Sequence, residues 1–429
     1  MKSRNITLIA AAATAAIVVT GCAPSGSSDQ KTTGSSDQKT TLTVLWQSNG
    51  DNSAIPATAK AFEKANPNVT VNVKTLADPD LDSLLGSQLR AGNGPDAFMV
   101  QLGAGTASSL VSLAQKGLIA KLDDVSWAKK IDKGTAAVGS YDGHLYGLSP
   151  TVGAEGAVYN LDAVEKAGLT IPTTWDELLK FCSDAKTAGT TAFGLGLKEG
   201  WTTRLVPDAL LATTVNDPVE VSKAIADGTF NYATDPGFQA AFEKEGQLNK
   251  AGCFNPSPVG TSIDNDTLPA TAKGQILATV TGAFHLGSLL AANPNVRVEI
   301  APLPASNTAS ENKMQLSYSN ALVVNAKSKN LAVAKKFADF FGQEQSLNAL
   351  AKQYQLNPTI PNSSYTSPPA LATIAKLGSE NRVVNLVWLA GPKQQQAATS
   401  AIQRLFLGTA TPSQLTQQIE DGYKQDNAK

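Results

Sequence analysis

Hydrophobic and polar positions over residues 42–117 switch repeatedly between strand-like and helix-like spacing. The run LTVLW at 42–46 is short and apolar, whereas VTVNVKT at 69–75 alternates like a half-buried strand. Between them, Ile55, Ala59 and Phe62 recur at helical spacing until Asn66-Pro67 ends the pattern. The predicted elements are, in order, strand 42–46, helix 53–65, strand 69–75, helix 82–90, strand 97–101 and helix 106–117. This β-α order predicts an α/β fold, a parallel sheet flanked by helices.

Ligands of such sheets bind beyond the carboxyl ends of the strands. The loops at 47–52 and 101–105 follow two of the predicted strands. Asn49, Asp51 and Gln101 are therefore candidate ligand-binding residues, although turn formation alone would also explain the first two.

The rest of the chain continues the alternation with longer helical stretches. Thr174 and Glu177 have the spacing of a helix N-cap and its capping-box partner. Further strands are expected at 276–281, 296–301 and 320–326, and further helices at 330–341, 393–407 and 412–424.

The N-terminus predicts export. Lys2 and Arg4 precede an uncharged, mostly apolar stretch at 6–20, which is typical of a secretory signal. The following Val19-Thr20-Gly21-Cys22 resembles a bacterial lipobox, which implies cleavage before Cys22 and acylation of its thiol. An ordinary signal peptide with an accidental cysteine is the alternative. We expect residues 1–21 to be a signal peptide of an extracytoplasmic lipoprotein anchored to the cell membrane.

A perfect octapeptide repeat follows the cysteine, GSSDQKTT at 26–33 and again at 34–41. Its composition cannot bury a core, so residues 22–41 are expected to form a flexible, lipid-anchored tether.

Composition excludes several classes of function. The chain has 35 Lys plus Arg and 36 Asp plus Glu, so no positive excess attracts nucleic acid. Only 2 His and 3 Cys are present, which argues against a metal framework, and neither a nucleophile elbow nor a P-loop motif occurs. We expect no metal and no cofactor. Cys182 and Cys253 form either one disulfide, as an oxidising compartment favours, or two buried thiols.

Several segments, in this order, carry a family resemblance. They are LTVLWQSNGDN at 42–52, AFEKANPNVTVNV at 61–73, GPDAFMV at 94–100, YDGHLYGLSP at 141–150, GAVYN at 156–160, TTWDELLKF at 173–181, AKGQILATVTGAF at 272–284, NALVVNAKSKNLAVAKKFADFF at 320–341 and VWLAGP at 387–392. With the lipobox, they resemble an extracellular solute-binding protein (family 1) of a bacterial ATP-binding-cassette (ABC) importer, in the sugar-binding group that includes maltose-binding protein.

The resemblance implies a type II periplasmic-binding-protein-like fold with two hinge-linked α/β lobes. The N-terminal lobe would hold 42–149 plus 302–343, and the C-terminal lobe 152–299 plus 346–429. The chain would cross the hinge near Pro150, Pro302 and Gly342. The two lobes would close on the ligand.

The resemblance also implies the function: a monomeric, non-enzymatic binding lipoprotein that passes a short oligosaccharide to ABC permease subunits. Aromatic faces and paired polar groups recognise sugars. Candidates on the expected cleft loops are Asn49, Asp51, Gln101, Glu155, Trp201, Arg204, Phe284, His285, Tyr318, Asn320 and Trp388. For Trp388, the family implies a ring that stacks on the sugar. Alternatives are a polyol, glycerophosphodiester, small peptide or polyamine as ligand, a secreted glycoside hydrolase, or a surface adhesin.

Overall fold

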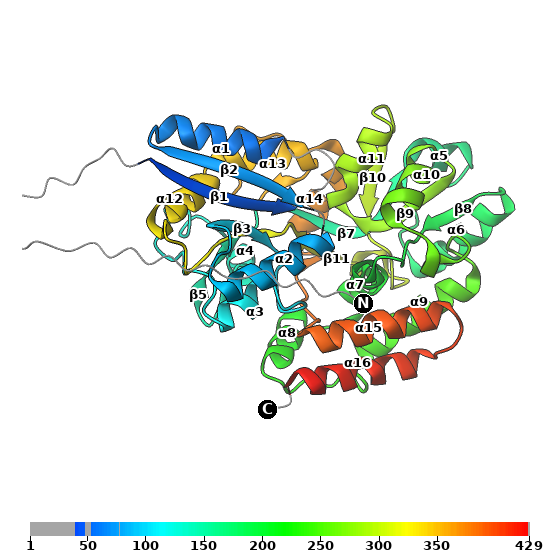
Figure 1. The fold of residues 1–429 in the computed structure, drawn as a ribbon. Coiled ribbons are helices and arrows are strands. Elements are labelled where there is room, and N and C mark those ends of the chain that lie inside the picture. Colours follow the sequence, from blue (N-terminus) through cyan, green and yellow to red (C-terminus); the bar gives the residue numbers. More distant parts are fainter. Residues whose placement is uncertain (1–38, 48–52, 77, 428–429) are drawn as a thin grey trace, which may run out of the picture. The chain divides into compact units, whose positions relative to one another are not determined.

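The computed structural model describes residues 39–47, 53–76 and 78–427 (Figure 1). The predicted signal peptide, residues 22–38 of the predicted tether (Cys22 included), Asn49 and Asp51 lie outside these residues. The tether was predicted to reach residue 41, but Thr40 and Thr41 pair with β2 (Val69–Leu76) as the start of strand β1 (Thr40–Gln47). Two main sheets, each flanked by helices, confirm the α/β class. Within the described part of the chain, no helix combines the length and apolar character needed to cross a bilayer.

The first sheet has the order β2-β1-β3-β12-β6. Its strands are β1 Thr40–Gln47, β2 Val69–Leu76, β3 Ala97–Val100, β6 Gly147–Leu148 and β12 Ala321–Val324. β1 pairs in parallel with β2 and β3, as the β-α order predicted. β12 is antiparallel to both β3 and β6, so the sheet is mixed.

Alternate side chains of β1 belong to two different hydrophobic cores. Leu42, Val44 and Trp46 pack in one cluster with residues of α1, α12 and α13. Leu45 points to the other face, where α2 and α3 contribute their leucines. The period of two along a strand therefore places helices on both faces of this sheet.

The second sheet is built around the long strand β7, Thr151–Asn160. Its path is β14-β11-β7-β9-β8, and β10 and β13 also pair with β7. The other bounds are β8 Thr191–Gly194, β9 Ile276–Gly282, β10 Val298–Ala301, β11 Met314–Tyr318, β13 Asn357–Pro358 and β14 Val383–Val384. A two-stranded hairpin, β4 Ser140–Tyr141 with β5 His144–Leu145, lies outside both sheets.

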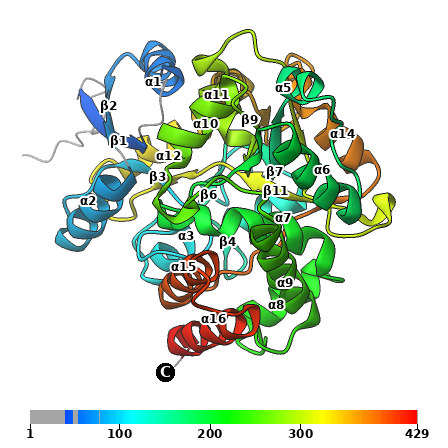
Figure 2. The ribbon, with the colours of Figure 1, turned by 90° about the vertical axis from the view of Figure 1, so that its right-hand side faces the viewer.

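The helices predicted at 53–65, 330–341 and 393–407 begin and end within one residue of those observed, whereas the helices predicted at 82–90 and 106–117 start four residues earlier and later, respectively, than predicted. Their bounds are α1 Ala54–Ala65, α2 Asp78–Ala91, α3 Leu110–Gln115, α4 Lys133–Val138, α5 Leu161–Lys166, α6 Trp175–Thr187, α7 Leu205–Thr214, α8 Pro218–Ala226, α9 Pro236–Ala251, α10 Leu268–Ala272, α11 Leu286–Ala292, α12 Leu331–Phe341, α13 Glu344–Tyr354, α14 Ala372–Ser379, α15 Pro392–Phe406 and α16 Pro412–Asn427. Thr174 caps α6 by accepting from the Glu177 amide, as the capping-box spacing predicted. α15 and α16 lie side by side (Figure 2).

The chain passes between the sheets at three places. The first lies at Ser149-Pro150, between β6 and β7. The second lies at Ser319-Asn320 rather than near Pro302, because 314–318 pairs with β7 as strand β11. The third follows α13 rather than Gly342, because Leu347 and Leu350 of α13 pack in the core of the first sheet. A proline or glycine marks a break in the chain but does not reveal which sheet the next element joins.

Cys182 of α6 and Cys253, just after α9, are joined by a disulfide with their Cα atoms 4.8 Å apart. Both cysteines are buried in the core of the second sheet. The bond therefore links two helices that pack on one another, and it closes a loop with a sequence separation of 71 residues.

Candidate functional site

Polar side chains meet where the first sheet ends. Gln47 is the last residue of β1, and its side-chain oxygen accepts a 2.6 Å hydrogen bond from the Asn320 amide. Gln101 directly follows β3 and is partly exposed. Because β12 is antiparallel to β3, with Ala321 opposite Val100, Asn320 lies on the same edge of the sheet as Gln101.

Glu155 lies in the middle of β7, and only 2% of its surface is exposed. The Ser317 hydroxyl on the neighbouring strand β11 donates to it at 3.2 Å. Arg204 forms an ion pair with it, with 3.2 Å between Nη1 and Oε1. This arginine ends the short 3₁₀ helix η1, Gly200–Arg204, from which α7 continues. Two predicted site residues, Glu155 and Arg204, are thus brought together.

Asp208 completes this cluster, and sequence reasoning missed it. It lies one helical turn after Arg204 and forms a second ion pair with the same Nη1. Burial raises the pKa of Glu155 to about 8; the Arg204 charge opposes that rise and the Asp208 charge adds to it. The spacing of an Arg and an Asp at i and i+4 was a visible signal, but many exposed helices carry the same spacing.

Trp388 lies in the core of the second sheet. It is 3% exposed, and Phe238 and Phe242 of α9 lie against it with ring centroids 6.0 and 6.3 Å away. Its indole N–H donates to Asp208. The stacking role that the family resemblance implied for Trp388 is therefore at odds with its place in the core. The sequence shows a tryptophan in a loop but not that two phenylalanines from a distant helix cover it.

Three other candidates form an aromatic group. The ring of Trp201 lies 6.0 Å from the rings of both Phe284 and His285, which are themselves 4.8 Å apart. Trp201 and Phe284 remain partly exposed. Phe284 and His285 belong to the short helix η4, Ala283–His285, which follows β9. Rings from two separate segments therefore form one apolar group.

His285 is held by hydrogen bonds on both ring nitrogens. Its Nδ1 lies 2.6 Å from the Thr281 hydroxyl, and its Nε2 lies 3.3 Å from Asp264. The hydrogen bond to His285 lowers the pKa of the Asp264 carboxyl. With both nitrogens engaged and little surface exposed, His285 supports the ring of Phe284 rather than offering a free donor.

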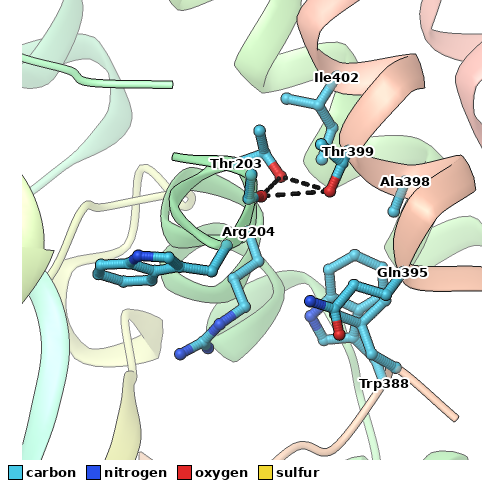
Figure 3. Close-up of a pocket in the computed structure, with 10 residues that line it drawn as sticks. Thr203, Arg204, Trp388, Gln395, Ala398, Thr399 and Ile402 are labelled. Carbon is cyan, nitrogen blue, oxygen red and sulfur yellow. Dashed lines mark hydrogen bonds between the residues drawn. The ribbon is translucent and has the colours of Figure 1, made fainter. Parts of the chain in front are cut away.

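A small pocket, with room for about one water molecule, lies between η1 and the start of α15 (Figure 3). Thr203, Arg204 and Trp388 line it together with Gln395 and Thr399 of α15. The two threonine hydroxyls are 3.5 Å apart. For Gln395 and Thr399, the one signal visible in the sequence was the polar run at the start of α15.

The loop after β3 reaches the same helix. A Cβ atom at Gly105 would lie 2.2 Å from the side-chain oxygen of Gln395. A larger residue at 105 would displace that side chain, so glycine permits the close approach. Residues after a strand of the first sheet thus contact α15, which packs in the core of the second sheet.

Tyr318 has different neighbours from the Arg204 cluster. A Cβ atom at Gly134 would lie 3.1 Å from its hydroxyl, which places the ring beside the start of α4. Burial raises the pKa of this hydroxyl, and the charge of Asp132 adds to the rise. Tyr318 directly precedes the second passage between the sheets, to which Asn320 belongs.

Among the described residues, no group of three or more His, Cys, Asp or Glu is placed to hold a metal ion. The arrangement is one of partly exposed rings and a partly exposed arginine at a buried cluster of charges. Such a set can bind by stacking and by hydrogen bonding.

Known proteins resemble the chain along most of its length. The "Multiple sugar-binding protein" of Streptococcus mutans is 22% identical over 357 residues, 82% of this chain and 81% of that protein. A solved structure described as RafE in complex with raffinose aligns with TM-score 0.74 and 20% identity over 90% of this chain and 100% of that one. A chitin oligosaccharide binding protein aligns with TM-score 0.77 and 20% identity over 91% and 99%. These structures share the two-lobed fold.

The sequence profile of one family matches most of the chain. It is described as "Bacterial extracellular solute-binding protein", and it matches residues 57–373. Members of this family bind solutes and are not enzymes. The chain therefore belongs to the bacterial extracellular solute-binding protein family.

Proposed function

We propose that this protein is the substrate-binding lipoprotein of an ABC importer for a short oligosaccharide. The observation that carries the proposal is the partly exposed pair Trp201 and Phe284, of which Trp201 lines a pocket together with Arg204. Aromatic faces suit the C–H patches of a sugar ring, and a guanidinium fork suits its hydroxyls. Relatives named as sugar-binding and lactose-binding proteins support the same class.

The mechanism is capture by hinge closure. A ligand that contacts both lobes favours the closed form by its differential affinity for that form. The three passages between the sheets, at 149–150, at 319–320 and after α13, are the segments that would bend. The closed complex then delivers the sugar to permease subunits, while separate subunits hydrolyse ATP.

Membrane attachment belongs to the same proposal. Acylation of Cys22 and a tether between Cys22 and the start of β1 would keep the monomeric domain close to the permease. One acyl chain alone holds a protein only weakly, so a full lipoprotein anchor with several chains fits this role better.

The charges of the site favour a neutral ligand over an ionic one. A phosphodiester needs a basic site, yet Arg204 already has two carboxyl partners. A polyamine needs free carboxylates, but Glu155 and Asp208 are 2% and 4% exposed and both are paired. A hydroxyl-rich neutral ligand avoids both difficulties.

Thermal unfolding against a ligand panel tests the function. The panel holds di- to tetrasaccharides including raffinose, stachyose and lactose, together with polyols, a glycerophosphodiester and polyamines. A sugar present at 100 times its Kd is expected to add about 2.7 kcal/mol to the free energy of unfolding. A shift from a polyamine or the phosphodiester alone would overturn the sugar assignment. A panel without any shift would contradict the binding function for these ligand classes.

The aromatic group makes a separate prediction. Phe284→Ala is expected to weaken binding of the sugar found in the panel by about 1–3 kcal/mol, because it removes a stacking surface. Calorimetric titration would measure the loss. Phe340→Ala, which truncates a partly buried ring beside the first sheet, is the matched control and should leave affinity unchanged. Equal affinities in the two variants would remove Phe284 from the site.

A further inference from the structure

Two buried carboxyl groups share one guanidinium beside the aromatic group. Glu155 and Asp208 are 2% and 4% exposed, whereas the side chain of Arg204 is 35% exposed. Both carboxyl groups contact the same nitrogen of the arginine, Nη1. One positive charge cannot neutralise two buried negative charges, so the cluster is most stable when it retains one proton.

Asp208 connects the η1–α7 segment to the loop before α15. One of its oxygens accepts from the indole N–H of Trp388, in the loop before α15. Its other oxygen accepts from Arg204, at the end of η1. The carboxyl group itself projects from α7. Both of its oxygens are occupied by groups that line the small pocket, so its place is fixed from two sides.

Arg204 retains unused donors. Within the described residues, its hydrogen bonds all come from Nη1, and none is found at Nε or Nη2. The side chain extends away from the Thr203 and Thr399 hydroxyls (Figure 3). The free N–H groups form a planar edge that can donate two parallel hydrogen bonds.

We infer that Asp208 is a positioning residue of the binding site, which fixes Arg204 through Nη1 so that Nε–H and Nη2–H face the ligand, and which keeps Glu155 in its neutral acid form. The ligand then meets a donor edge on a cluster of zero net charge. Such an edge donates to hydroxyl and ring oxygens, and the cluster as a whole adds no net charge to attract an ionic ligand. This assignment of a ligand rests on the proposed function; the arrangement of the three side chains does not.

The surroundings of Glu155 support this charge state. Arg204 from η1, Asp208 from α7 and Ser317 from β11 face it directly. Other charged groups on elements packed against β7 have partners of their own or are exposed: His285 with Asp264, Glu299 with Thr373, Asp162 and Glu165 with Arg297, Glu344 with Ser364, and exposed Lys352. The pKa of Glu155, raised to about 8, places its ionisation within reach of experiment.

The test is a pH titration of the whole protein without ligand. The signal is the indole Nε1–H resonance of Trp388 in ¹⁵N-tryptophan-labelled samples, and its assignment comes from Trp388→Phe. Because Trp388 donates to Asp208, its resonance reports on the cluster. In the wild type we expect a pH-dependent shift with a midpoint near pH 8. Glu155→Gln should abolish that midpoint.

Asp208→Asn should move the indole resonance and lower the midpoint by about one pH unit or more, because it removes the negative charge that helps to keep Glu155 protonated. Asp264→Asn, which breaks the nearby ion pair of His285, is the control and should leave the midpoint in place. If Asp208→Asn does not fold, the wild type and Glu155→Gln still test the protonation of Glu155, which the inference requires.

A wild-type resonance that does not titrate, or a midpoint that survives in Glu155→Gln, would overturn the inference. Because no sugar is present, that outcome is independent of the ligand panel. A panel without a sugar shift would remove the ligand while leaving the positioning role of Asp208 intact.

Discussion

Replacing both Cys182 and Cys253 by alanine is expected to lower the free energy of unfolding by about 4 kcal/mol. The disulfide closes a loop with a sequence separation of 71 residues, so its loss returns a large conformational freedom to the unfolded chain. Alanine is the appropriate replacement, because both positions are buried and a serine hydroxyl would lack a partner there.

Equilibrium unfolding in urea, with and without reductant, measures this effect. The double variant should be insensitive to reductant, which makes it its own control for effects of the reagent. The wild type should lose a similar amount of stability once its disulfide is reduced in the unfolded state. Equal stability of the wild type in both conditions would show that the two cysteines do not form this bond in the protein.

The local pattern predicted much of the first sheet. The apolar run at 42–46, the alternation at 69–75 and the short strand at 97–101 all became neighbouring parallel strands. Spacing along a strand or helix is a local property, and it is therefore visible in the sequence.

Local spacing did not predict the antiparallel strands of the first sheet or two of the passages between the sheets. β11 and β12 are separated by Ser319 and Asn320 alone, yet β11 pairs with β7 and β12 pairs with β3. Which sheet receives each strand depends on partners far away in the sequence. Family resemblance placed the second passage near a proline, but strand pairing places it at 319–320.

The candidate site shows the same division. Trp201, Phe284 and His285 come from two loops and do lie together. Asp208 and the burial of Trp388 escaped notice, because both depend on the contacts of α7 and α9 with the loop before α15. A side chain in a loop can be exposed or covered, and the covering residues determine which.

Glu245 of α9 is expected to make the protein lose stability as the pH rises. It is 0% exposed, and among the described residues neither of its carboxyl oxygens has a hydrogen-bond partner. Burial raises its pKa well above the ordinary value. The folded protein therefore holds Glu245 as a neutral acid, whereas the unfolded chain releases the proton above about pH 4.3.

The sign follows from proton linkage. The folded state binds more protons than the unfolded state between the unfolded pKa and the raised folded pKa. Within that window, the free energy of unfolding should fall by about 1.4 kcal/mol per pH unit on account of this group. Below the unfolded pKa, both states are protonated and the stability contributed by the neutral acid is fully present.

Glu245→Gln removes the titration and keeps the shape, so stability measured from pH 4 to pH 8 should fall less steeply in this variant than in the wild type. Glu155, whose pKa is also raised, acts with the same sign but cancels in the comparison. Glu243→Gln, on the exposed side of the same helix, is the matched control and should follow the wild-type curve. Parallel curves for Glu245→Gln and the wild type would mean that Glu245 reaches water or a partner in solution. A widening gap between them would establish that α9 buries a neutral acid at neutral pH.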